Sequence, residues 1–154
     1  MPTLSRFNSA MPALTRRRSK DAHAESWQIF YGDVQVGMIG IRAGVPVDVD
    51  QWGWSCGFYP RSHHLEHHDG TAETFQQARA GFEAAWQDYM PGCTEADFTG
   101  YRRQRDWTAW KYAMWDAGMK LPTQLPDGRA RCFCGTPIDV PGTAQHVYAA
   151  HMRT

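Results

Sequence analysis

Three runs of alternating apolar and polar residues predict a small antiparallel sheet in the first half of the chain. The first two runs, residues 27–31 and 34–38, are separated by Gly32-Asp33, a pair typical of a hairpin turn. A third run, residues 51–59, follows a loop that contains glycine and proline. The pattern therefore predicts a three-stranded antiparallel meander. Its apolar positions are Trp27, Ile29, Tyr31, Val34, Val36, Met38, Trp52, Trp54, Cys56 and Phe58.

Apolar residues recur at helical spacing between residues 71 and 90, which predicts an amphipathic helix. Thr71 is the expected N-cap, and the Pro-Gly pair at 91–92 is the expected stop. We expect this helix to cover the aromatic face of the sheet, because Trp52 and Trp54 need apolar partners. The residues of its apolar stripe are Phe75, Ala78, Phe82, Ala85, Trp86 and Tyr89.

A second, aromatic-rich helix is predicted to begin at Thr94 and to run to about Ala117. Thr94 and Asp97 are arranged as a capping box, with aspartate where glutamate is usual. Gly100 is a point at which this helix is expected to break into a short and a long piece, and Gly118 is the expected C-terminal cap. The predicted core stripe is Trp107, Trp110, Met114 and Ala117.

Two cysteines and two histidines near the C-terminus have the spacing C-x-C-x11-H-x4-H. Two thiolates and two imidazoles suit a tetrahedral structural zinc, and Gly135 lets the backbone turn closely after the second cysteine. The histidines are expected on a helix capped by Thr143, where five residues of separation turn them roughly 140° apart. A shared metal therefore requires that the helix end or distort at its last turn. The predicted ligands are Cys132, Cys134, His146 and His151.

The segment around these ligands has few large aliphatic residues, so a structural zinc would supply stability that its core lacks. The pattern resembles small Cys2His2 zinc ribbons and knuckles over residues 132–151. Only Gln145 on the expected helix suits contact with a DNA base edge, which favours a structural zinc. The alternative is that both cysteines are ordinary reduced thiols and both histidines are surface residues.

Four of the seven histidines fall within six residues, between Pro60 and Asp69-Gly70. We interpret this segment as a solvated loop that joins the last strand to the first helix. A second metal site, or a metal-dependent hydrolase that uses this loop, is an alternative, because such pairs at helical spacing bind zinc or nickel. The histidines are His63, His64, His67 and His68.

Basic residues are concentrated in two zones that are candidates for binding nucleic acid. In the second zone basic residues are interleaved with aromatic residues, a pattern that fits better with an ordinary helix with solvated arginines and buried tryptophans but leaves the nucleic-acid surface as an alternative. The candidate residues are Arg16, Arg17, Arg18 and Lys20 in the first zone and Arg102, Arg103, Arg105 and Lys111 in the second.

Together these elements predict an α+β fold: a three-stranded antiparallel meander covered by an amphipathic helix, a second aromatic-rich helix and a small zinc-stabilised tail. We expect a disordered basic arm over residues 1–25, an α+β domain over 26–120 and a Cys2His2-type zinc-binding tail over 121–154. The element order of residues 27–90 resembles binding modules of the double-stranded-RNA-binding type and antitoxins with that partial fold. This resemblance rests on no motif residue, and it implies no functional residue.

The 154 residues carry 16 basic and 16 acidic side chains, and this neutrality conceals three segments of different charge. Residues 1–20 carry +5, residues 21–100 carry −9 and residues 101–154 carry +4. Local basic surfaces therefore remain available for nucleic acid, while the acidic middle segment suits a basic protein partner. Four cysteines are too few for a secreted disulfide scaffold, and no stretch approaches the roughly 20 apolar residues of a membrane span.

The sequence therefore predicts a small cytoplasmic zinc-binding accessory or regulatory module that binds nucleic acid or a nucleic-acid-handling protein. One alternative is an antitoxin-like or inhibitor-like protein-binding module that uses the acidic middle segment. The other is the metal-dependent hydrolase. Phosphate-binding glycine loops, nucleophile elbows and dinucleotide fingerprints are absent from the sequence, so an enzyme is the less favoured interpretation.

Overall fold

The computed structural model describes residues 13–20, 23–61 and 68–153, and these residues form an α+β fold. The chain divides into two compact units, Met1–Phe98 and Thr99–Thr154, which we call the sheet unit and the C-terminal unit. In the described ranges, no helix is both long and apolar enough to cross a membrane.

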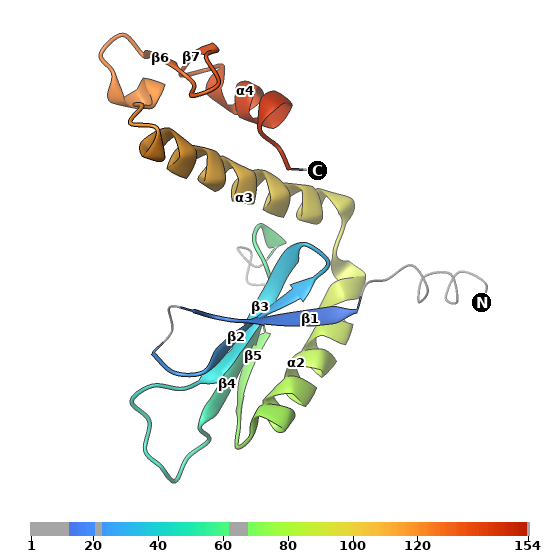
Figure 1. Cartoon of the computed structure of the whole chain (residues 1–154). Coiled ribbons are helices and arrows are strands. Elements are labelled where there is room, and N and C mark those ends of the chain that lie inside the picture. The colour runs from blue at the N-terminus through green and yellow to red at the C-terminus, as the bar shows by residue number, and fades with distance from the viewer. Residues whose placement is uncertain (1–12, 21–22, 62–67, 154) are drawn as a thin grey trace, which may run out of the picture. The chain divides into compact units, whose positions relative to one another are not determined.

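The sheet unit contains a five-stranded antiparallel sheet with the strand order β1-β2-β3-β4-β5 (Figure 1). The helix α2, Phe75–Tyr89, follows the last strand and lies along one face of the sheet. A short 3-10 turn, Met90–Gly92, then leads to α3, Glu95–Asp116. The strands are β1 (Leu14–Arg18), β2 (Ser26–Tyr31), β3 (Val34–Ile41), β4 (Trp52–Cys56) and β5 (His68–Ala72).

The predicted meander is confirmed as β2, β3 and β4, but the prediction of only three strands is wrong. One additional strand is β1. It contains Arg16, Arg17 and Arg18, which the sequence pattern assigns to the disordered arm. It pairs antiparallel with β2, and aromatic rings of that strand contact its guanidinium groups. The Arg16 guanidinium lies 4.4 Å from the Trp27 ring centroid, and that of Arg17 lies 4.7 Å from the Phe30 ring centroid.

The other additional strand is β5. It lies where the sequence predicts the end of the histidine loop and the first turn of the amphipathic helix. Its small residues leave room for the Trp54 indole, since a Cβ added at Gly70 would lie 2.7 Å from Trp54 Cζ2. The helix α2 begins later than predicted, with Thr74 rather than Thr71 as its N-cap. The Thr74 hydroxyl accepts a hydrogen bond from the Gln77 N–H at 3.2 Å.

The predicted stripe of α2 is confirmed as the centre of the core of the sheet unit. The Phe75 ring meets Trp52 edge-on at 5.5 Å, and the Phe82 ring meets Trp54 edge-on at 6.5 Å. Each buried side chain of this size contributes about 1.5–3 kcal/mol through removal of apolar surface from water. The buried residues of the helix are Ala78, Phe82, Ala85, Trp86 and Tyr89.

The helix α3 is continuous through Gly100, contrary to the predicted break. Its capping box is confirmed, because the Thr94 N–H donates to Asp97 Oδ2 at 2.8 Å and the Asp97 N–H donates to Thr94 Oγ1 at 3.2 Å. Gly118 has a φ of +72° and ends the helix as expected. Ala117, which we had placed in the core stripe, is exposed.

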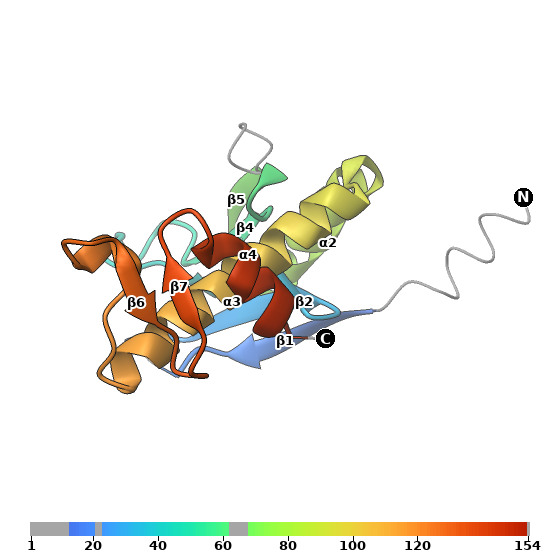
Figure 2. The ribbon, with the colours of Figure 1, turned by 90° about the horizontal axis from the view of Figure 1, so that it is seen from above.

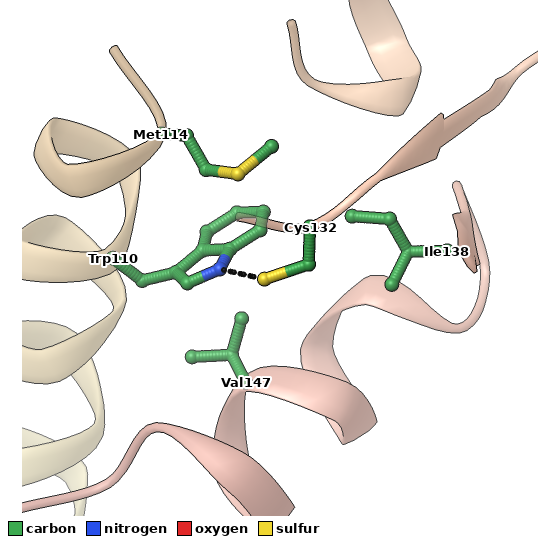
Figure 3. Packing of buried hydrophobic residues seen from close by; sticks show 5 residues of the cluster. All are labelled: Trp110, Met114, Cys132, Ile138 and Val147. Atoms are coloured by element: carbon green, nitrogen blue, oxygen red, sulfur yellow. Dashed lines mark hydrogen bonds between the residues drawn. The ribbon is translucent and has the colours of Figure 1, made fainter. Parts of the chain in front are cut away.

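The C-terminal unit packs a short hairpin and a final helix beside α3 (Figure 1, Figure 2). The hairpin consists of β6, Arg129–Arg131, and β7, Pro137–Asp139, and the final helix is α4, Thr143–Ala150. A small core joins these elements and is shown in Figure 3. Its buried members are Trp110, Met114, Cys132, Ile138 and Val147.

Candidate metal centre

The loop of the β6–β7 hairpin presents two thiols next to each other. The Cys132 N–H donates to the Thr136 carbonyl at 2.9 Å, and the Gly135 N–H donates to the Cys132 carbonyl at 2.8 Å. The second bond requires a sharp reversal, which Gly135 permits with a φ of +95°. This compact loop places both Cys132 and Cys134 opposite α4.

The helix α4 provides the two histidines, one from within the helix and one from its end. His146 lies within α4. His151 is the C-cap, and its backbone is no longer helical, with φ −126° and ψ 11°. The requirement that the helix end before the second histidine is therefore met. The start of α4 differs from the prediction, because Gly142 rather than Thr143 is the N-cap.

The four ligand atoms converge at distances that fit a tetrahedral metal. His151 Nε2 lies 3.3 Å from Cys132 Sγ and 3.3 Å from His146 Nε2, and His146 Nε2 lies 3.5 Å from Cys134 Sγ. All four atoms lie within 4.8 Å of one another. A tetrahedral zinc with ordinary bond lengths separates sulfur from nitrogen by about 3.6 Å and nitrogen from nitrogen by about 3.4 Å. The cluster can therefore hold a metal such as zinc.

The two sulfur atoms have different surroundings. Cys132 is buried and its Sγ accepts a hydrogen bond from the Trp110 indole N–H at 3.3 Å, whereas Cys134 is exposed and its Sγ lies 3.4 Å from the Thr136 hydroxyl. Hydrogen bonds from the Thr136 hydroxyl and N–H lower the pKa of the Cys134 thiol to about 6. Thiolate is the form that binds metal, so this loop favours the required state of Cys134.

The histidine segment is described only at its end. His63, His64 and His67 lie outside the described residues, while His68 is an exposed residue of β5. The His68 ring meets the Tyr89 ring edge-on at 6.1 Å. Within the described ranges, the C-terminal cluster is the one group of three or more metal-binding side chains that converge.

The two predicted basic zones have different environments. In the first zone, Arg16, Arg17, Arg18 and Lys20 are all exposed on or beside β1. In the second, Lys111 is exposed, and the Arg103 guanidinium lies 4.9 Å from the Tyr148 ring centroid. The guanidinium of the half-buried Arg105 instead bonds Asp106 at 2.8 and 3.1 Å, so Asp106 balances its charge. Arg102 is also half-buried and interacts with other residues, so it is not a free cation.

Two buried polar contacts of this unit were not identified from the sequence. One is the Trp110–Cys132 hydrogen bond. The other is centred on Asp106, which is 1 % exposed and also accepts the Arg153 N–H at 2.9 Å. A signal for the second existed, because Asp106 precedes Trp110 and Met114 at a spacing of four and so lies on the apolar stripe.

Comparison with known proteins identifies no relative of this chain. No protein-family model, curated protein or solved structure matches the chain at a significant level. The functional interpretation therefore depends on the residues of the site alone.

Proposed function

We propose that this chain is a small zinc-stabilised module that binds nucleic acid and in which the zinc is structural. The observation that supports a structural zinc is the completeness of the ligand set. Two cysteines and two histidines fill the four positions of a tetrahedral ion, whereas catalytic zinc sites keep one position open for water or substrate. The five buried hydrophobic residues around the cluster are few for a unit of this length, which also favours a stabilising metal.

Metal analysis of protein purified without a histidine tag tests the zinc proposal. We expect one zinc per chain in the wild type and loss of that zinc in Cys132→Ser, because a tetrahedral site with three ligands binds far more weakly. Cys93→Ser is the matched control, since Cys93 is a half-buried cysteine outside the cluster. Wild-type protein without zinc, or Cys132→Ser with a full complement, would overturn the proposal.

The row of cations on β1 supports binding to nucleic acid. Among the residues that the structure describes, Arg16, Arg17, Arg18 and Lys20 have no carboxylate partner. The Arg16 guanidinium lies 4.4 Å from the Trp27 ring centroid and 4.7 Å from that of Phe75. These rings orient a planar group whose N–H donors suit phosphate oxygens.

Two aromatic side chains on α3 are consistent with this function. Tyr112 and Trp115 are 67 % and 78 % exposed, whereas Trp110 and Met114 of the same helix are buried. Exposed rings beside Lys111 suit stacking on unpaired bases. We do not include Arg105 among the residues proposed to contact nucleic acid, because Asp106 balances its charge.

Titration of the protein with labelled duplex and single strands at about 50 mM salt tests this function. Replacing Arg16, Arg17 and Arg18 by glutamine should weaken binding and reduce the slope of log K against log salt by about two to three. The control variant replaces three other exposed cations, Arg79, Lys120 and Arg129, and should retain most of the affinity. Absence of binding by the wild type, or equal loss in both variants, would contradict the proposal.

A further inference from the structure

The indole of Trp110 contacts one member of the Cys2His2 cluster, the buried Cys132. Its N–H lies 3.3 Å from Cys132 Sγ, and the two side chains are 2 % and 0 % exposed (Figure 3). Trp110 comes from the middle of α3, whereas Cys132 comes from the loop of the β6–β7 hairpin. The bond therefore connects the cluster to an element that supplies none of its ligands.

The burial of both groups makes this bond important for each partner. An indole N–H is a donor only, and it is costly to bury without an acceptor. A buried thiolate is costlier still unless a donor or a cation stabilises its charge. The apolar neighbours Met114, Ile138 and Val147 have no donor to offer, and the other polar group at this sulfur is the candidate ligand His151. Cys134 differs, because water and Thr136 reach its sulfur.

We propose that Trp110 is a positioning residue of the metal centre. Its N–H fixes the orientation of Cys132 Sγ and withdraws electron density from the sulfur that binds the metal. Groups of this kind around metal ligands set both affinity and the electronic properties of the site. The inference rests on the proposed zinc centre and adds a residue that ligand spacing does not identify.

The experiment must separate this role from simple packing, because Trp110 also fills the core. Replacement of Trp110 by benzothienylalanine keeps the size and shape of the side chain and substitutes sulfur for the N–H. Trp110→Phe is a second variant that also removes the N–H. Trp107→Phe is the matched control, because Trp107 is half-buried on the same helix, its ring centroid is 5.5 Å from that of Trp110, and it does not bond a thiolate.

Co²⁺ is the probe, because its thiolate charge-transfer band reports on the electron density of the ligating sulfur. We expect the benzothienylalanine variant to shift this band to lower energy and to bind Zn²⁺ about 10–100-fold more weakly in chelator competition. Trp107→Phe should leave the band in place and change the affinity by less than about twofold.

Two further outcomes are distinguishable. A benzothienylalanine variant with an unchanged band and unchanged Zn²⁺ affinity would show that Trp110 only packs, and the inference would fail while the zinc centre stands. A wild-type protein that takes up neither Co²⁺ nor Zn²⁺ would overturn the zinc centre and, with it, the inference. Because the benzothienyl group preserves packing, the result does not depend on whether Trp110→Phe folds.

Discussion

The two units of this chain differ in the size of their hydrophobic cores. Among the described residues, the sheet unit buries twelve hydrophobic side chains and the C-terminal unit buries five. The sheet unit includes four buried aromatic residues, Phe58, Phe82, Trp86 and Tyr89, against Trp110 alone in the C-terminal unit. Burial of each large apolar side chain contributes about 1.5–3 kcal/mol, so the C-terminal unit gains less stability from its core and has the greater need of another source.

The polar contacts of the two units show the same contrast. In the C-terminal unit, distant residues are brought together by the Cys2His2 cluster, which could hold a metal, and by the buried Asp106, which accepts hydrogen bonds from Arg105 and Arg153. In the sheet unit, strand pairing and aromatic packing bring the distant segments together. The chain therefore combines a unit with a large aromatic core and a unit in which polar contacts join residues that are distant in sequence.

The largest expected effect is loss of the C-terminal unit when the metal is removed. Structural zinc contributes on the order of 10 kcal/mol of apparent folding free energy in small metal-binding domains. Excess chelator should therefore abolish amide hydrogen-exchange protection in α4 and the β6–β7 hairpin and leave that of β3 and α2 intact. Added Zn²⁺ should restore the protection.

Equal loss of protection in both units would contradict this expectation, because it would show that the sheet unit also depends on the metal. Unchanged protection in α4 would show that the five-residue core is sufficient. Cys93→Ser protein, treated with the same chelator, is the control for effects of thiol chemistry in the sheet unit.

Local periodicity explains which parts of the fold were predictable. The stripe of α2 follows the helical repeat, and alternation identifies the three strands of the meander. The predicted inward position of Met38 is wrong: the β2–β3 register shifts at Ile29/Phe30, so Met38 is exposed and Ile39 is buried instead. The strand β1 was missed because three consecutive arginines indicate a solvated arm unless aromatic rings receive them. Those rings belong to β2 and α2, and no local pattern shows that they lie beside Arg16 and Arg17.

The convergence of the four candidate metal ligands was predictable for a different reason. Cys132, Cys134, His146 and His151 are chemically distinctive and lie close in sequence, so their spacing alone restricts the geometry. The contacts of Trp110 with Cys132 and of Asp106 with Arg153 join residues 22 and 47 positions apart. Such pairs depend on the packing of α3 against the tail, which the sequence pattern does not determine.

A change in the core of the sheet unit should have the next largest effect. Phe82 is 1 % exposed and contacts Trp54, so Phe82→Ala should lower the unfolding free energy of the sheet unit by about 3–5 kcal/mol. Denaturant unfolding of the wild type and of Phe82→Ala gives this difference in unfolding free energy. Zinc affinity should remain unchanged. A loss of zinc in Phe82→Ala would show that the cluster depends on the core of the sheet unit. Val47→Ala, at a fully exposed position, is the control.

The smallest of these effects concerns the buried carboxylate of the C-terminal unit. Burial opposes ionisation of Asp106, but hydrogen bonds from Arg105 and from the Arg153 N–H outweigh it and lower its pKa below the usual value of 3.8. Asp106→Asn keeps the shape and loses the charge, so we expect it to cost about 1–3 kcal/mol at neutral pH. Asp116→Asn, at an exposed position of the same helix, should have little effect.

The pH dependence of this cost has a definite sign. Because the pKa of Asp106 is lower in the folded state, its stabilisation is complete above about pH 5 and is lost as the pH falls through the folded value. The difference in unfolding free energy between wild type and Asp106→Asn should therefore shrink toward low pH. Acid also releases zinc and would unfold the unit that contains Asp106, so the comparison is made with excess Zn²⁺ and only at pH values at which both proteins keep α4 protected from hydrogen exchange. A difference that stays constant over that range, down to pH values near the usual 3.8 of an aspartate, would mean that Asp106 contributes through packing rather than charge.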